Sequence, residues 1–401
     1  MSLESEKQRI LSNIRNYGTT NLNCIPCPFE SFRNYWFGIT KKRYYLVTAA
    51  SKGAKTQTAS FLFLYTPILY AFEHQESIDL HIRYFSMEED VETIKDRFYS
   101  FLLRKFLKER VGTEDLECFY GKLSERYAHL LFETDPFKSV IEFFESHIEF
   151  IFDNNSESVH DNIIQFAEQY GTIKYNENDV MVGYTPNNPN TWLMTYHDHI
   201  SMLETLPNQT LKSAIDSVDK TLVRTRNVCK MIHVVVQQQN TQSTGLEART
   251  KGLIEPVQSG LSDSQNPGKS ADITFGVVNP YGSEFPTYRG YKVYQDGGLF
   301  DHCRFIKVVL ARKDVKVAGC YCNLFFDGRT CFFSELPPAV KATKTEKELL
   351  ERIYKYVGTI IQTKPEVRNT LSDIESSECS LDTSNSTILT IFSKVVKRFT
   401  K

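Results

Sequence analysis

Residues 49–56 (AASKGAKT) constrain the fold of this 401-residue chain more than any other segment. They follow an apolar run at 44–48, which predicts a buried strand, and they precede a helical pattern that extends from Thr56 to about Phe72. A loop of this kind, with Lys55 and Thr56 where the helix begins, is the context in which backbone N–H groups and a helix N-terminus hold phosphate. The lysine then neutralises phosphate oxygens and the hydroxyl binds Mg²⁺.

The loop departs from the strict phosphate-loop pattern at both of its glycines. That pattern has glycine at the positions of Ala49 and Ala54, whereas Gly53 lies one place early. Because alanine tolerates a positive φ poorly, the alternative is an ordinary strand-to-helix turn that happens to contain Lys-Thr. If a nucleotide binds, the sequence predicts contacts from Ala50, Ser51, Lys52, Gly53, Ala54, Lys55, Thr56 and Gln57.

Strand and helix patterns alternate along much of the chain. This order predicts an α/β fold with a mostly parallel central sheet flanked by helices. The expected strands cover 44–48, 78–85, 192–196, 232–236, 273–278, 305–311 and 319–326, and the principal expected helices cover 56–72, 87–108, 210–230 and 344–362.

We divide the sequence into three regions. Residues 1–38 are interpreted as an N-terminal helix and linker arm, and residues 39–337 as the α/β domain, in which 113–190 is a largely helical insertion with a strand candidate at 148–152. Residues 338–401 are interpreted as a helix, a flexible acidic and serine-rich linker and a basic terminal helix. The terminal helix is compatible with binding DNA, a partner or a membrane surface, and with packing on the protein itself.

Composition places the chain among globular proteins and leaves its partners open. A hydrophobic content of 41% and a charged content of 24% are ordinary, and a net charge of −2 is compatible with a local basic lining for nucleic acid. The sequence contains no apolar stretch long enough to span a bilayer, and its polar start has no signal-peptide core. We therefore expect a cytoplasmic protein with free thiols and no membrane partner.

The cysteines give no strong metal signal. Cys24 and Cys27 have metal-like spacing, but a second pair at a zinc-ribbon distance is missing, and closed zinc sites have four ligands. Cys320 and Cys322 alternate with Tyr321 in a predicted strand, so both face the same side and are expected to pack in the core.

Two acidic residues follow predicted strands where a phosphate site needs them. Asp198 ends the strand at 192–196 and would hold Mg²⁺ together with Thr56, directly or through water. Glu88 follows the strand at 78–85 and would orient or deprotonate a water molecule. The alternative for Glu88 is that it belongs with Glu89 and Asp90 to an acidic cap of the next helix.

Two histidines flank Asp198, and three glutamines follow the predicted strand at 232–236. His197 and His199 flank Asp198, but strand neighbours point to opposite faces, so a transition-metal site made from these three residues is not expected. Of the glutamines at 237–239, Gln237 is interpreted as an exposed polar residue whose side chain points away from that of its neighbour.

Taken in order, these segments resemble the ATPase domain of DnaB-type replicative helicases, in particular phage-like members of the RecA superfamily. The resemblance extends from about Cys24 to Pro337. It is carried by residues 25–32 (IPCPFESF) as the lead-in, 45–56 as the strand and Walker A loop, 85–89 (FSMEE) as the strand that ends in the glutamate, 193–203 (LMTYHDHISML) as the Walker B region, and 234–239 (VVVQQQ) as the strand that ends in a sensor glutamine. Matching without gaps implies that Gln239 is the glutamine that senses the γ-phosphate, with Gln238 as the alternative.

The resemblance implies a RecA-like P-loop ATPase that binds ATP and Mg²⁺ and moves along single-stranded DNA as a hexameric ring. The loop after Gln239 would then contact DNA phosphates through Arg249 and Lys251, although a solvated basic loop is the alternative. Because only residues 1–38 precede the core, a separate primase or helicase loader is expected by analogy. A phage protein acting in the host cytoplasm would fit these expectations.

Residues 309–314 (VLARKD) resemble the family segment whose lysine and arginine reach a neighbouring subunit's nucleotide. Arg312 matches the arginine, but Leu310 stands where the lysine would be, so Lys313 or Lys307 would have to substitute. Residues 325–328 (FFDG) then match a turn in the closing hairpin.

Two other functions remain compatible with the sequence. The first is a different RecA-like ATPase, such as a recombinase-like filament protein. The second is a nucleotide-binding scaffold that keeps the fold but has lost turnover, because alanine replaces glycine in the loop.

Overall fold

A computed structural model describes residues 24–119, 121–240, 250–312 and 319–362, together with Glu4, Lys7, Gln8 and Leu11. Most of the predicted N-terminal helix, Arg249, the acidic linker and the basic terminal helix lie outside these residues.

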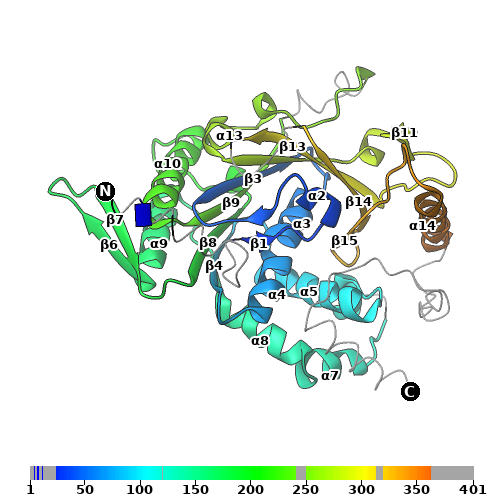
Figure 1. Ribbon diagram of the computed structural model, residues 1–401, viewed down its shortest axis with the longest axis horizontal. Coiled ribbons are helices and arrows are strands. Elements are labelled where there is room, and N and C mark those ends of the chain that lie inside the picture. The colour runs from blue at the N-terminus through cyan, green and yellow to red at the C-terminus, as the bar shows by residue number, and fades with distance from the viewer. Residues whose placement is uncertain are drawn as a thin grey trace.

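A nine-stranded sheet organises the molecule, in the order β15-β14-β13-β10-β3-β9-β8-β4-β5 (Figure 1). Six neighbouring strands are parallel: β10 (Ile273–Val278), β3 (Arg43–Ala49), β9 (Ile232–Gln238), β8 (Thr191–Asp198), β4 (Asp79–Ser86) and β5 (Ile148–Ile151). The other three are antiparallel: β13 (Cys303–Ala311), β14 (Tyr321–Asp327) and β15 (Phe332–Glu335). The predicted mostly parallel sheet is confirmed, and residues 325–328 do lie at a hairpin, between β14 and β15.

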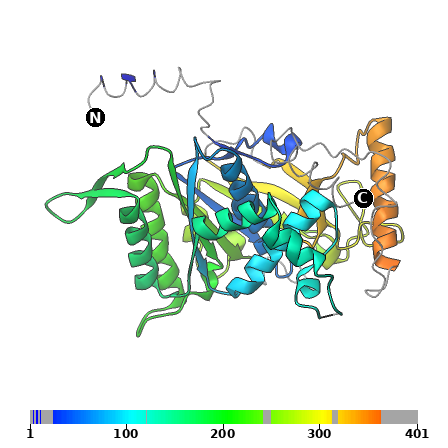
Figure 2. The same cartoon turned by 90° about the horizontal axis from the view of Figure 1, so that it is seen from below.

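Helices cover both faces of the sheet because alternate residues of the buried strands point to opposite sides. In β3, Tyr45 and Val47 pack in one core and Tyr44 and Leu46 in the other. The first core is covered by α3 (Lys55–Ser60), η1 (Phe61–Tyr65), α4 (Thr66–Glu73), α5 (Val91–Leu102), η2 (Leu103–Leu107) and α8 (Phe137–His147). The second is covered by α9 (Ser156–Gln169) and α10 (Leu211–Cys229), which lie together at one side of the molecule (Figures 1 and 2).

The lead-in segment packs as part of the core. Within it, β1 (Ile25–Pro26) pairs with β2 (Gly38–Ile39), and α2 (Glu30–Arg33) lies between them in sequence. Phe32 and Trp36 are fully buried against β3 and β10 side chains. Residues 24–38, predicted as a linker arm, are therefore continuous with the α/β core in packing.

Residues 113–190 are helical only in part. They contain α6 (Thr113–Leu116), α7 (Arg126–Glu133), α8 and α9, but also β5, which is the edge strand of the central sheet, as the alternating pattern at 148–152 suggested. A hairpin of β6 (Gly171–Tyr175) and β7 (Met181–Pro186) follows and projects beside α9 (Figure 1). The prediction of a largely helical insertion is therefore corrected at this hairpin. The residues between β6 and β7 form a turn, so that the two strands pair with each other.

The predicted helix at 344–362 is confirmed as α14 (Lys344–Gln362), which packs with β13 and β14 side chains in a third core. The remaining short elements are η3 (Ile200–Met202), η4 (Gln258–Gly260), α13 (Asn266–Ser270), η5 (Tyr281–Ser283), β11 (Thr287–Tyr288) and β12 (Tyr291–Lys292). Cys320 and Cys322 are buried in the core, as expected. Within the described residues, no helix combines the length and apolar character that crossing a bilayer requires.

Candidate nucleotide-binding site

The loop between β3 and α3 forms a tight turn at the carboxyl edge of the sheet. Gly53 N–H donates to the Ala50 carbonyl at 3.0 Å, and Ala54 has the left-handed conformation, with φ 66° and ψ 35°. The alanine thus adopts the conformation for which the strict pattern uses glycine. At position 53 the need for glycine is one of space, because an added Cβ would lie 2.7 Å from the Ala49 Cβ and 2.9 Å from the Ala50 oxygen.

A buried arginine holds this loop from the antiparallel side of the sheet. Arg304 is 2% exposed, and its Nε donates to the Gly53 carbonyl at 3.2 Å. Its guanidinium also donates to the Asp301 carboxylate at 2.9 Å, and Asn279 Nδ2 donates to both Asp301 (3.2 Å) and the Lys52 carbonyl (3.3 Å). These three side chains were not predicted from the sequence. The sequence did contain one signal for them: Arg304 is a charged residue near the start of an apolar strand, and a charge buried there requires a partner.

Asp198 ends β8 and faces the beginning of α3. Its Oδ1 accepts from Thr56 Oγ1 at 3.2 Å, and its Oδ2 accepts from Tyr84 OH at 3.3 Å. Burial raises the pKa of Asp198 to about 7; Glu89 and Glu88 add to the rise, and Lys55 and Thr56 oppose it. A hydroxyl and a carboxylate this close form an oxygen-only donor set, which suits Mg²⁺. The predicted pair Thr56 and Asp198 is therefore brought together in a suitable arrangement.

Glu88 joins the same group from the end of β4. Its Oε2 lies 3.8 Å from Lys55 Nζ and 3.5 Å from His199 Nε2, and its side chain is 42% exposed. The helix-capping alternative applies to its neighbours, since Asp90 accepts from Thr93 N–H at 2.7 Å at the start of α5 and Glu89 pairs with Arg97. Glu88 is thus the acid of this cluster that faces the lysine.

His199 is a site residue that was not predicted from the sequence. His197 is fully buried, with Nε2 2.9 Å from Thr195 Oγ1 and its ring stacked on Phe85, whereas Asp198 contacts Thr56 and Tyr84, so these two strand neighbours point to opposite faces as expected. His199, by contrast, lies beside the proposed site, with its Nε2 3.5 Å from Glu88 Oε2. Burial lowers the pKa of His199, and nearby Lys55 lowers it further, so the imidazole is favoured in its neutral form.

The three glutamines occupy different environments. Gln239 is 2% exposed; its Nε2 donates to Thr48 Oγ1 at 3.0 Å and its Oε1 accepts from Val257 N–H at 3.2 Å. These bonds place its amide beside the strand that leads into the phosphate loop, and its role as a phosphate sensor stays a prediction. The prediction that Gln237 is an exposed polar residue is wrong, because it is fully buried and donates to the Ser262 and Ser264 carbonyls. Gln238 is half-buried.

Arg312, which was predicted to act between molecules, lies away from this cluster. Arg312 follows β13, where Ala311 pairs with Ile273 at the amino end of β10, and it donates to the Lys269 carbonyl. The phosphate loop follows β3 at the opposite edge of the sheet, so Arg312 is not part of its own chain's site. Of the suggested substitutes, Lys307 pairs with Glu255 at 2.7 Å and Lys313 lies outside the described residues. Lys251 is exposed in a turn.

No known family model and no curated protein sequence matches this chain. Its structure is similar to a solved structure described as an ATPase domain, with a TM-score of 0.58 and 13% identity, covering 84% of this chain and 99% of that one. It is also similar to a DnaB-like replicative helicase whose structure was described with its primase interactions, with a TM-score of 0.55 and 12% identity, covering 83% of this chain and 68% of that one. The chain therefore has the RecA-like α/β fold found in the ATPase domains of DnaB-like helicases.

Proposed function

We propose that this chain is an ATP-dependent DNA helicase that hydrolyses ATP at the carboxyl edge of the central sheet. The observation that supports this most is the convergence of Lys55, Thr56, Glu88 and Asp198 from three separate strand ends onto one small region. Phosphoryl transfer depends on positioning and charge stabilisation more than on covalent chemistry, and these four side chains supply both.

Each residue has a role that follows from its position. The loop N–H groups and the α3 N-terminus bind phosphate oxygens, and Lys55 neutralises the charge of the terminal phosphates. Thr56 and Asp198 would hold Mg²⁺, which supplies further charge neutralisation when bound. Glu88 accepts a proton from the attacking water, and Lys55 and His199 on either side hold its carboxylate in place.

Assembly is the second part of the proposal. Arg312 and the phosphate loop lie at opposite ends of the same strands, so Arg312 of one subunit would reach the nucleotide of its neighbour in a head-to-tail arrangement. Such contacts close into rings or continue as filaments, and we propose the hexameric ring. Arg249 and Lys251 would then contact the phosphates of single-stranded DNA in the ring, and a primase or a loader would bind separately.

Measurement of ATP turnover with and without single-stranded DNA tests the proposal, with Lys55→Ala as the test variant. We expect DNA-stimulated hydrolysis in the wild type and a loss of at least about 100-fold in the variant. Lys122→Ala is the matched control, since Lys122 is an exposed surface lysine. Unchanged turnover in Lys55→Ala, or no turnover in the wild type at saturating ATP, overturns the enzymatic proposal. Electron microscopy with ATP and DNA then distinguishes rings from recombinase-like filaments.

A further inference from the structure

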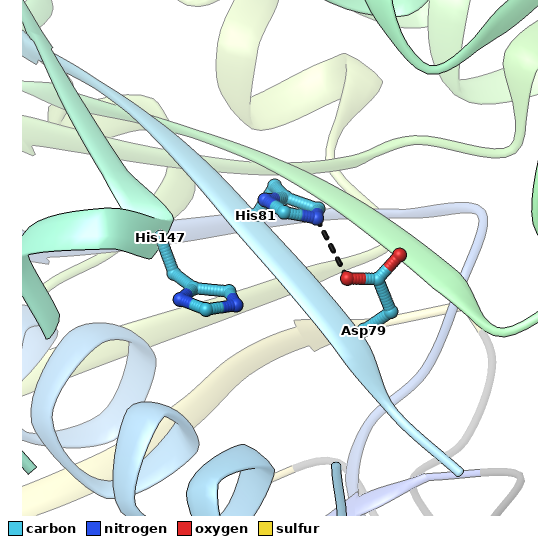
Figure 3. Close-up of side chains that lie close together, drawn as sticks. All are labelled: Asp79, His81 and His147. Atoms are coloured by element: carbon cyan, nitrogen blue, oxygen red, sulfur yellow. Dashed lines mark hydrogen bonds and ion pairs between the residues drawn. The ribbon is translucent and has the colours of Figure 1, made fainter. Parts of the chain in front are cut away.

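Two histidines and an aspartate gather at the amino edge of the sheet, opposite the edge that holds the proposed nucleotide site. Figure 3 shows the three side chains close together. Asp79 and His81 lie at the beginning of β4, and His147 is the last residue of α8, directly before β5. Asp79 Oδ1 is 2.7 Å from His81 Nε2, and the two imidazole centroids are 5.1 Å apart. One ligand atom from each residue lies within 4.8 Å of the others.

The parallel pairing of β4 with β5 produces this arrangement. Ile82 pairs with Ile148, so the residues one step earlier, His81 and His147, lie side by side on neighbouring chain segments. Asp79 is two residues before His81, and residues two apart in a strand face the same side. The cluster thus depends on a long-range strand pairing.

The other polar atoms of these residues are bonded as metal ligands usually are. His147 Nδ1 lies 2.9 Å from the Phe143 carbonyl, which leaves Nε2 as the ligand atom, and His81 Nδ1 lies 3.1 Å from Tyr170 OH. Asp79 Oδ2 accepts from Thr191 Oγ1 at 2.7 Å and from Asn188 Nδ2 at 3.2 Å, which leaves Oδ1. Metal-bound histidines and carboxylates almost always have such outer partners, because these fix the orientation of the ligand.

We propose that Asp79, His81 and His147 bind one Zn²⁺ ion, with water as the fourth ligand. Two imidazole nitrogens and one carboxylate oxygen suit a borderline transition metal, whereas Mg²⁺ prefers oxygen ligands alone. Ligand atoms in a tetrahedral zinc site are about 3.3 Å apart, given bonds of about 2.0–2.1 Å. The Asp79 Oδ1–His81 Nε2 separation of 2.7 Å is shorter than that value, and the other ligand atoms lie within 4.8 Å, so small side-chain rotations complete the site.

The ion would join segments that are distant in sequence. It would tie the beginning of β4 to the end of α8, while the outer partners Thr191 and Tyr170 extend the connection to β8 and α9. All of these groups lie at the ends of the strands opposite the phosphate loop. Zinc binding is therefore expected to stabilise this edge of the sheet and to be independent of ATP turnover.

The competing explanation is a hydrogen-bonded aromatic stack without metal. His81 also stacks on Tyr170 at 4.2 Å, and His147 stacks on Phe143 at 3.8 Å. The variant His147→Phe separates the two explanations, because it preserves the ring stack but removes the nitrogen ligand. Asp79→Asn provides a second variant that changes a ligand without altering side-chain volume.

The experiment uses the full chain without a polyhistidine tag, stripped with a chelator and titrated with Zn²⁺ in the absence of nucleotide. We expect one equivalent of zinc per chain, a rise in melting temperature of about 3 °C, and the visible absorption bands of tetrahedral Co²⁺ when cobalt replaces zinc. His147→Phe and Asp79→Asn should weaken zinc binding at least about 100-fold. His129→Ala, which removes an exposed histidine on α7, should leave zinc binding unchanged.

Lys55→Ala should also bind one zinc, which separates this result from the test of ATP hydrolysis. The proposal is overturned if the wild type binds no stoichiometric zinc, or if folded His147→Phe and Asp79→Asn both bind it as tightly as the wild type does. In the latter case the metal is held elsewhere, for example by cysteines.

Discussion

The two ends of the parallel strands both gather polar side chains, but they satisfy them differently. At the carboxyl end, Lys55 and Glu88 are 3.8 Å apart, and Asp198 is buried with hydroxyl donors at 3.2 and 3.3 Å. At the amino end, Asp79 has His81 and Thr191 each at 2.7 Å. The first arrangement keeps charges near one another without close pairing, as the proposed exchange of a charged nucleotide would require. The second is a tightly bonded cluster.

The pKa values of the two aspartates show the same difference. Burial raises the pKa of Asp198 to about 7, and its hydrogen bonds do not reverse this. Burial also raises the pKa of Asp79, but Thr191 and His81 outweigh it and hold the pKa below its usual value. Without ligands, the ionised Asp198 carboxylate therefore destabilises the folded state, whereas the ionised Asp79 carboxylate stabilises it.

The largest expected effect comes from Glu88→Gln. Removal of the base should lower the maximal rate of ATP hydrolysis at least about 100-fold while leaving ATP binding nearly unchanged, because the amide retains the shape of the side chain but cannot accept the proton. Rapid-mixing hydrolysis assays and a fluorescent-nucleotide binding assay measure the two quantities. Glu92→Gln, an exposed acid on the next helix, is the control. Equal loss of turnover in both variants would remove Glu88 from its proposed role.

A second test compares Asp198→Asn with Asp79→Asn in chelated, nucleotide-free protein. Because the folded pKa of Asp198 lies above its usual value, the cost of its ionisation develops between about pH 4 and about pH 7 and stays constant above that. Asp198→Asn should therefore stabilise the fold by about 2–4 kcal/mol at pH 8 and by less at pH 5.

Asp79→Asn should have the opposite sign and cost about 1 kcal/mol at pH 8. Thermal or urea unfolding at the two pH values measures both variants. If Asp198→Asn destabilises the protein at pH 8, the contrast between the two ends of the strands is wrong.

The smallest expected effect concerns the backbone of the phosphate loop. Ala54→Gly should raise stability by up to about 1 kcal/mol, since glycine adopts the left-handed conformation without the cost that alanine has. Gly53→Ala is the matched opposite change and should lower stability and ATP affinity, because its Cβ would contact Ala49. Urea unfolding and nucleotide titration distinguish the two variants. A loss of stability in Ala54→Gly would contradict the conformational explanation.

The sequence predicted the parts of the site that depend on where strands end. Asp198 and Glu88 each follow a run of buried residues, and the carboxyl ends of parallel strands meet at one edge of a sheet, so their convergence could be inferred. Gln237 could not be placed in this way, because its burial depends on Ser262 and Ser264 from a later loop. Strand alternation alone had suggested that the Gln237 side chain is exposed.

The site residues that the sequence did not predict depend on contacts between segments that are distant in the chain. Arg304 reaches the loop because β13 adds to the sheet antiparallel beside β10, and His147 meets His81 because β5 pairs with β4. Strand order sets both of these contacts, and composition and periodicity along the chain do not determine it. The β6–β7 hairpin was local enough to predict, since Asn176, Asn178 and Asp179 favour a turn between two short runs of alternating residues.

The loop at 49–56 also affects how such sites are recognised in other chains. Its alanine adopts the conformation that a motif assigns to glycine, and its glycine lies where a side chain would not fit. The loop thus requires a particular backbone conformation and a small residue at position 53, and more than one amino-acid sequence meets these requirements. A search for fixed letters would discard this chain, whereas a search for the shape of the turn would retain it.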